Sequence, residues 1–219
     1  MTLNQSSVKL RTDMDKKVKQ IPVIGISGPS GAGKDYLTLV VIERLGVANP
    51  QMVTTRPHRG EGVETKICIS GVDYNNHLEG GELVGHHENK GFHYAYRIGD
   101  IQALAAGGAT GAIIELNPVY QAAVPLELAE RPEAKGVSLV RWFVLEADPE
   151  YLTHNMTARQ EMEAEELAKR LDMARMIMEA GQKLAGRDEV MMFKVGWHNR
   201  ETMADEFAKL VTESLGSQA

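Results

Sequence analysis

The sequence predicts an α/β protein in which a mainly parallel sheet is covered by helices on both faces. Short runs of apolar, largely β-branched residues are typical of buried parallel strands. Segments with apolar residues at helical spacing lie between these runs. Strands that alternate with helices form a parallel sheet, because each crossover helix packs back onto it. The expected strands are 21–27, 111–116, 137–145 and 190–195.

The composition narrows the class of protein. The chain has 219 residues, a formal charge of −6 and one cysteine, Cys68. An acidic chain is poorly suited to general nucleic-acid binding, which depends on Lys and Arg meeting phosphates. A lone cysteine forms no internal disulfide, and no apolar run approaches the ~20 residues that a membrane span needs. We therefore expect a cytoplasmic protein with no membrane segment and a flexible, polar N-terminal extension at 1–20.

The first helix is expected at 34–45, where apolar residues recur at helical spacing and Gly46 ends the pattern. Later helices are expected at 101–106, at 118–130 with an interruption at Pro125, from Pro149 onward, at 161–185 and at 204–215. Residues 51–97 differ from the rest, because they are dense in Gly, His, Asn and charged residues and their apolar runs are short. This segment predicts an inserted lobe of small strands with one short helix.

A glycine-rich loop follows the first expected strand. It matches G-x-x-x-x-G-K, with an aspartate where Ser or Thr is usual. Glycines let the backbone curl so that N–H groups meet phosphate oxygens at the start of the following helix, and Lys34 can reach the β- and γ-phosphates. The predicted ATP-binding residues are Gly28, Pro29, Ser30, Gly31, Ala32, Gly33, Lys34 and Asp35.

Two carboxylates stand close to this predicted phosphate site. Asp35 replaces the hydroxyl that normally touches Mg²⁺, and a carboxylate is a hard oxygen donor that can hold Mg²⁺ directly or through water. The alternative is that the protein has no metal site, because Asp35 replaces the hydroxyl that would contact the metal. Glu115 ends the second expected strand, at the sheet edge where ligands gather. It can face Mg²⁺, a water or the acceptor, or be an ordinary strand-end acid.

The loop pairs with the run Thr54-Thr55-Arg56-Pro57-His58-Arg59-Gly60-Glu61, and together they resemble the guanylate kinase family. Gly81-Glu82-Leu83 and Gly91-Phe92-His93-Tyr94 resemble the acceptor-lobe strands of the family, and a weaker match at 159–171 resembles its lid and the helix after it. The resemblance covers 21–215 and implies a three-layer P-loop NTPase fold with a five-stranded parallel sheet. It also implies a P-loop core at 21–50 and 98–219, an acceptor-binding lobe at 51–97 and a lid at 155–168, all within one domain at 21–219.

The resemblance assigns further site residues. Arg56 and Arg59 fall on arginines that hold the acceptor's phosphate, a role for which the forked guanidinium is well shaped. Tyr94 falls on a phosphate-contacting tyrosine. Arg159 and Arg170 fall on lid arginines that, with Lys34, stabilise the phosphoryl group in transfer. The alternative for both lid positions is a solvated charge on an acidic helix.

Several departures from the family concern the acceptor. Val53 and Gly85 are aligned with the residues that read guanine, and Lys66 with an acceptor tyrosine. Ribose 1,5-bisphosphate phosphokinases resemble this chain in their Gly-Lys-Asp loop, in the run at 64–70 and in the histidine-containing strand at 86–89. His86 and His87 should point to opposite faces of that strand, which disfavours a shared metal; a sugar or phosphate contact by one histidine stays open.

Three functions follow from these observations. The first is an ATP- and Mg²⁺-dependent kinase that phosphorylates a small phosphorylated acceptor, a nucleoside monophosphate such as GMP. The second is a ribose 1,5-bisphosphate phosphokinase. The third is a non-catalytic guanylate kinase-like binding module, which is disfavoured because such modules typically lack the loop lysine and the lid arginines.

Overall fold

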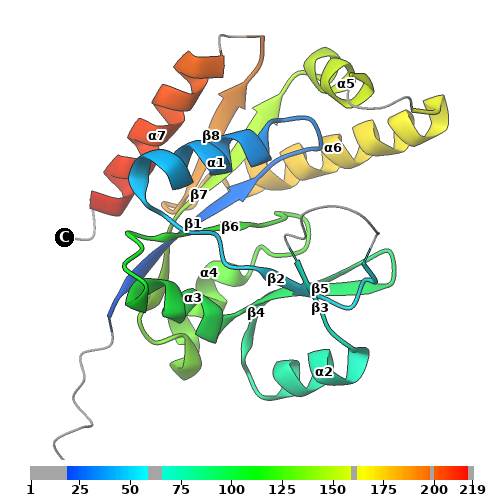
Figure 1. Ribbon diagram of the computed structural model, residues 1–219. Coiled ribbons are helices and arrows are strands. Elements are labelled where there is room, and N and C mark those ends of the chain that lie inside the picture. Colours follow the sequence, from blue (N-terminus) through cyan, green and yellow to red (C-terminus); the bar gives the residue numbers. More distant parts are fainter. Residues whose placement is uncertain (1–18, 59–65, 159–161, 198–199, 217–219) are drawn as a thin grey trace, which may run out of the picture.

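The computed structural model describes residues 19–58, 66–158, 162–197 and 200–216 (Figure 1). Its larger sheet has the strand order β6-β1-β7-β8, and all three neighbouring pairs are parallel. The strands are β1 (Ile21–Ser27), β6 (Ala112–Glu115), β7 (Val137–Ala147) and β8 (Val190–Val195). The prediction of an α/β fold with a parallel sheet is confirmed.

Helices cover both faces of this sheet (Figure 1). Ile24 and Ile26 of β1 pack in one core cluster with α1 (Lys34–Leu45) and α7 (Arg200–Gly216), whereas Ile21 and Val23 belong to the opposite cluster. That second cluster includes α3 (Ile98–Ala106) and α4 (Val124–Glu130). Because alternate strand residues face opposite sides and both sides are buried, β1 is apolar up to its last residue, Ser27.

The prediction of a fifth parallel strand is wrong. Among the described residues, the larger sheet has four strands. After α1 the chain meets β6 only at Ala48, whose N–H donates to the Gly111 oxygen at 2.9 Å and whose oxygen accepts from Ile113 N at 2.9 Å. The next rung would need an N–H at Pro50, which has none. The N–H of Glu115, the other half of that rung, donates instead to the Tyr96 hydroxyl at 2.9 Å.

A second sheet of order β3-β2-β5-β4 comes from the segment expected to form the inserted lobe. Its strands are β2 (Met52–Thr54), β3 (Lys66–Cys68), β4 (Leu83–Asn89) and β5 (Phe92–Arg97), with helix α2 (Gly71–Glu79) on one side. Val53 and Ala95 cluster with Tyr74 of α2, whereas Met52, Tyr94 and Tyr96 join the larger core. One face of the lobe sheet therefore packs against α2, and the other faces the larger sheet at the end that carries the glycine-rich loop. The division of the chain into core, lobe and lid remains a prediction.

The helices expected at 118–130 and 161–185 begin later than the sequence patterns suggested, those expected at 101–106 and 204–215 begin earlier, and the one expected from Pro149 begins there. Pro125 lies in the first turn of α4, where a missing N–H costs nothing, so it starts that helix and does not interrupt one. The other elements are η2 (Pro132–Ala134), α5 (Pro149–Thr157) and α6 (Ala164–Leu184). Within the described parts of the chain, no helix has the length and apolar content needed to cross a membrane. The expected extension at 1–20 lies outside the described residues except for its last two positions.

Candidate active site

The glycine-rich loop joins β1 to α1 and is shaped by close packing. Gly33 caps α1 with φ +90°, a left-handed conformation that favours glycine. Gly28 passes so close to β7 that an added Cβ would lie 2.7 Å from Leu145 Cβ. From α5, the Asn155 amide donates to the Gly31 oxygen at 2.9 Å. The loop is thus held by β7 on one side and by α5 on another.

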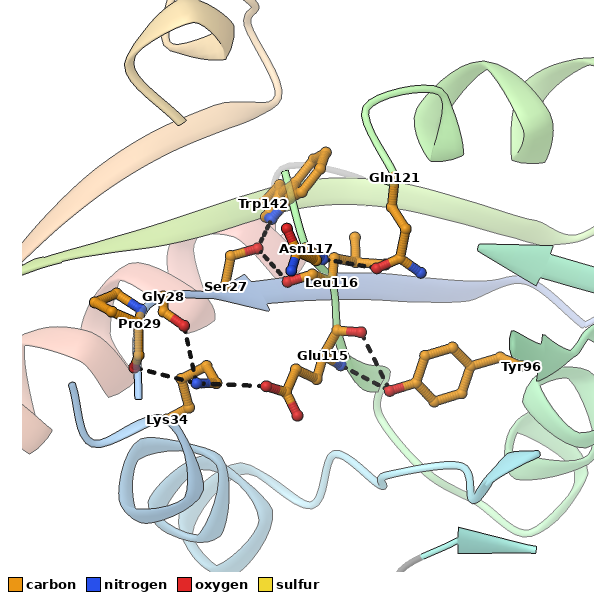
Figure 2. A network of polar contacts seen from close by, with 10 residues as sticks. All are labelled: Ser27, Gly28, Pro29, Lys34, Tyr96, Glu115, Leu116, Asn117, Gln121 and Trp142. Atoms are coloured by element: carbon orange, nitrogen blue, oxygen red, sulfur yellow. Dashed lines mark hydrogen bonds and ion pairs between the residues drawn. The ribbon is translucent and has the colours of Figure 1, made fainter. Parts of the chain in front are cut away.

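A buried hydroxyl fixes the end of β1 immediately before the loop. Ser27 Oγ donates to the Leu116 oxygen at 2.6 Å and accepts from the indole N–H of Trp142 at 2.5 Å (Figure 2). Ser27 and Trp142 are both fully buried. The two bonds tie the carboxyl end of β1 to β7 and to the segment after β6, so the strand ends that carry the loop and Glu115 are held together.

The Lys34 ammonium lies between the loop and the end of β6 (Figure 2). It donates to the carbonyl oxygens of Gly28 and Pro29 at 2.9 and 3.3 Å, and lies 3.4 Å from Glu115 Oε1. Its side chain is 16% exposed, and that of Glu115 is 50% exposed. Lys34 therefore sits at the mouth of the loop, where phosphate oxygens can replace its present neutral acceptors.

In the part of the chain that the structure describes, Lys34 lines three cavities, and the two that also include Ser30 meet at the mouth of the loop. One, the loop cavity, has a volume of about 550 Å³ and is lined by loop residues together with Asp35, Met162 and Arg170. The other, the lobe cavity, has a volume of about 280 Å³ and lies between the P-loop end of the larger sheet and the lobe sheet. The residues that line both cavities are Ser30, Lys34, Lys66 and Glu115.

Sequence comparison found no matching protein-family model and no matching curated protein. Among solved structures, a guanylate kinase from Anaplasma phagocytophilum aligns with 90% of this chain and 87% of its own, with a TM-score of 0.57 and 15% sequence identity. The chain has a guanylate kinase-like fold.

In this guanylate kinase-like fold, Arg56, Lys66, Tyr94 and Glu115 all line the lobe cavity. The Lys66 ammonium lies 5.0 Å from the centroid of the Tyr94 ring, and the Arg56 guanidinium 5.7 Å from that of Phe92. These contacts keep two cations at the wall that borders Lys34. Arg59, the fifth expected acceptor residue, lies outside the described residues.

One of the two predicted lid arginines lines the loop cavity. Arg170 of α6 lines that cavity, and its Nε donates to Glu166 Oε1 at 2.9 Å. This hydrogen bond lowers the pKa of the Glu166 carboxyl. Arg159 and residues 159–161 of the expected lid lie outside the described part. Arg170 is thus beside the predicted phosphate site, paired with a carboxylate one helical turn away.

The residues around the loop cavity fit a magnesium ion bound with nucleotide phosphates. Asp35 and Glu115 both line the cavity, and carboxylate oxygens are ligands that Mg²⁺ takes. Mg²⁺ is usually held by one or two carboxylates together with substrate phosphates, not by an all-protein cage. Accordingly, the described residues contain no group of three or more His, Cys, Asp or Glu arranged to hold a metal.

Placing the guanine-reading positions at Val53 and Gly85 is not supported by this geometry. Val53 is fully buried in the cluster on the α2 side, whereas its neighbour Met52 lines the lobe cavity. Gly85 has φ +66°, and an added Cβ would lie 2.7 Å from the amide nitrogen of Gln121. Strand alternation puts the Val53 side chain on the wrong face, and Gly85 cannot carry a side chain without strain.

The lobe cavity also contains residues that motif analysis did not assign. They are His87, Asn89, Asn117, Tyr120 and Gln121. The Gln121 amide donates to the Gly85 oxygen, and its own oxygen accepts from Asn117 N at 2.6 Å, which links the lobe to the segment after β6. The histidine-containing strand was a signal for His87. Because a helix was expected at 118–130, the sequence did not predict the polar turn that holds Tyr120 and Gln121.

Proposed function

We propose that this protein is an ATP-dependent phosphotransferase that moves the γ-phosphoryl group to a small phosphorylated acceptor, a nucleoside monophosphate. The observation that carries the proposal is that the two cavities share one wall at Lys34. A donor phosphate over the P-loop and an acceptor phosphate at Arg56 and Lys66 would then lie on either side of one ammonium group.

The chemistry of such a site is positioning and charge stabilisation, with no covalent intermediate. Lys34 would exchange its hydrogen bonds to the carbonyl oxygens of Gly28 and Pro29 for contacts with the β- and γ-phosphates. Arg170 would turn from Glu166 to the equatorial oxygens of the phosphoryl in transfer. Asp35 would hold Mg²⁺, which would supply positive charge that offsets the charge of the phosphates.

On the acceptor side, Arg56, Lys66 and Tyr94 would hold the phosphate that attacks. Glu115 lies 3.4 Å from Lys34, so it would orient the ammonium group or share with Asp35 in holding Mg²⁺. Tyr94 is almost fully buried, which limits its movement. The acceptor oxygen would thereby be aimed at the γ-phosphorus.

A second acceptor, a ribose bisphosphate, is favoured by one specific observation. Guanine presents adjacent N–H donors that a buried site pairs with a carboxylate or an equivalent acceptor. Within the described chain, Glu115 is the one carboxylate lining the lobe cavity, and it is engaged by Lys34. An acceptor with phosphate and sugar but no base leaves no such donors unpaired.

A binding module without turnover is the proposal from another class. It is disfavoured by Lys34 and Arg170, both of which line the loop cavity. A module that has lost catalysis has no need of a lysine and a lid arginine around the same phosphate site. ADP release that depends on an added acceptor would separate the enzyme from the module.

The test is a coupled ADP-release assay with ATP and Mg²⁺ across GMP, dGMP, dTMP, UMP and ribose 1,5-bisphosphate. Lys34→Ala should lower kcat by roughly 10²–10³ or more, because it removes the cation at the transferring phosphoryl. Lys194→Ala, which alters an exposed lysine of β8, is the matched control and should keep full activity. Turnover by a folded Lys34→Ala protein within threefold of wild type would refute the donor-site assignment. Absence of MgATP binding by calorimetry would refute the function as a whole.

A further inference from the structure

The imidazole of His87 is held in one orientation at the wall of the lobe cavity. His87 of β4 stands opposite Tyr94 of β5, just after an irregularity in the pairing of the two strands. Its ring stacks against Tyr94, with centroids 5.3 Å apart and planes inclined by 20°, and against Tyr120, at 5.9 Å and 6°. Two aromatic neighbours therefore fix the plane of the ring.

The hydrogen bond at Nδ1 decides which nitrogen of this ring can accept. Nδ1 lies 3.2 Å from the Gly85 oxygen, and because a carbonyl only accepts, Nδ1 carries the hydrogen. The Gly85 peptide is itself fixed, since its N–H donates to Glu127 Oε2 at 3.1 Å and its oxygen also accepts from Gln121. In the neutral ring Nε2 then has a free lone pair, and no partner for it occurs among the described residues.

The surroundings favour the neutral ring. Burial lowers the pKa of His87, and the nearby charges of His86 and Lys66 lower it further, while the hydrogen bond to Gly85 and the carboxylate of Glu115 oppose the shift. Near pH 7 the ring is therefore an acceptor at Nε2, with no charge to attract a second phosphate.

The position of the ring indicates which part of the acceptor it meets. Tyr94 stacks on the His87 ring, and the Lys66 ammonium lies 5.0 Å from the centroid of the Tyr94 ring, so Tyr94 links the histidine to one cation of the predicted phosphate site. A phosphate held by Lys66 and Arg56 would lie beside Tyr94. The group attached directly to that phosphate, and hence next to His87, is the sugar and not a base.

We propose that His87 is a specificity-determining residue that accepts, at Nε2, a hydrogen bond from a hydroxyl of the acceptor's sugar. The acceptor class is then a sugar phosphate, with or without a base, that carries a hydroxyl beside the phosphorylated end. This inference rests on the proposed phosphotransfer function, and it adds a requirement for that hydroxyl.

The experiment removes the two partners separately and together. GMP, its 2′-deoxy and 3′-deoxy analogues and ribose 1,5-bisphosphate are compared with wild type and with His87→Phe, which keeps a stacking ring but has no acceptor nitrogen. In wild type, loss of the contacted hydroxyl should raise KM roughly 2- to 10-fold with little change in kcat, the effect of one net hydrogen bond. In His87→Phe the same deoxy analogue should bind no worse than its parent. His77→Phe, which alters a lobe histidine paired with Glu82, is the control.

A purely structural role for His87 predicts a different pattern. His87→Phe would then raise KM by the same factor for every acceptor. The proposal is overturned if removing the hydroxyl changes KM by the same factor in wild type and in His87→Phe. Wild-type KM should also rise as the pH falls below about 6.5, because His87 becomes protonated. This rise should be missing in His87→Phe, which has no imidazole at that position.

Failure of the proposed function can be told apart from failure of this inference. If MgATP binds but no acceptor is phosphorylated, ribose 5-phosphate is titrated into ¹⁵N-histidine-labelled protein, with His87→Phe used to assign the resonance. A saturable shift of the His87 Nε2 signal supports the sugar contact even without turnover. Saturable binding without that shift, or no binding of any of these sugar phosphates, overturns it.

Discussion

Replacing Ser27 by alanine tests whether the carboxyl end of β1 depends on one buried hydroxyl. That hydroxyl donates to the Leu116 oxygen and accepts from the Trp142 indole N–H, at 2.6 and 2.5 Å. Ser27→Ala removes one oxygen and leaves two buried groups, one donor and one acceptor, without their partner. The backbone of β1 is otherwise unchanged.

The expected cost follows from those two groups. A buried polar group left without its partner costs about 1–3 kcal/mol, and the loss of an ordinary hydrogen bond about 1 kcal/mol. Because the indole N–H is fully buried and the carbonyl has a second lone pair, we expect a total of about 2–4 kcal/mol in the free energy of unfolding. For a chain of this length that lowers Tm by roughly 5–15 °C.

Urea and thermal unfolding followed by circular dichroism measure this change. Ser214→Ala is the matched control, since Ser214 is also buried but its hydroxyl donates only to the oxygen four residues earlier in α7, at 2.8 Å. We expect the control to change the free energy of unfolding by less than about 1 kcal/mol. If Ser27→Ala and Ser214→Ala unfold at the same urea concentration, the account of Ser27 as a link between β1, β7 and the segment after β6 is wrong.

The remaining predictions concern the lid, the lobe and pH. Arg170→Ala should lower kcat by roughly 10²–10³ with little change in Tm, because its pair with Glu166 is partly exposed; unchanged kcat would remove it from the site. Val53→Ser should lower stability by about 1–3 kcal/mol without improving KM for GMP, since it places a hydroxyl in a buried apolar cluster; a gain with GMP would contradict the observed strand face. Burial lowers the pKa values of His86 and His87, so the folded protein favours their neutral forms. Stability, measured as the urea midpoint, should therefore fall as the pH drops below about 6.5, and His86→Phe with His87→Phe should flatten that slope.

The sequence by itself determined the local features of this protein. Apolar runs indicated the four strands of the larger sheet, because residues buried on both faces must all be apolar. The spacing of Gly28, Gly33 and Lys34 predicted a turn between a strand and a helix, and the structure has a turn at that position between β1 and α1; that it binds phosphate stays a prediction. These signals are contained within a dozen neighbouring residues, so periodicity and backbone preferences are sufficient to find them.

Only the tertiary structure decided how distant segments combine. Pro50 is visible in the sequence, but its effect depends on its register against Glu115 and on the Tyr96 hydroxyl from another sheet. Likewise, only the structure shows that Met52 lines the lobe cavity whereas Val53 packs on the α2 side, because neighbouring side chains of a strand point to opposite faces. The stacking that orients His87 joins residues brought together by strand pairing and by the turn at 117–121, where the sequence patterns had suggested a helix. Contacts between separate segments depend on packing, and packing leaves no periodic trace along the chain.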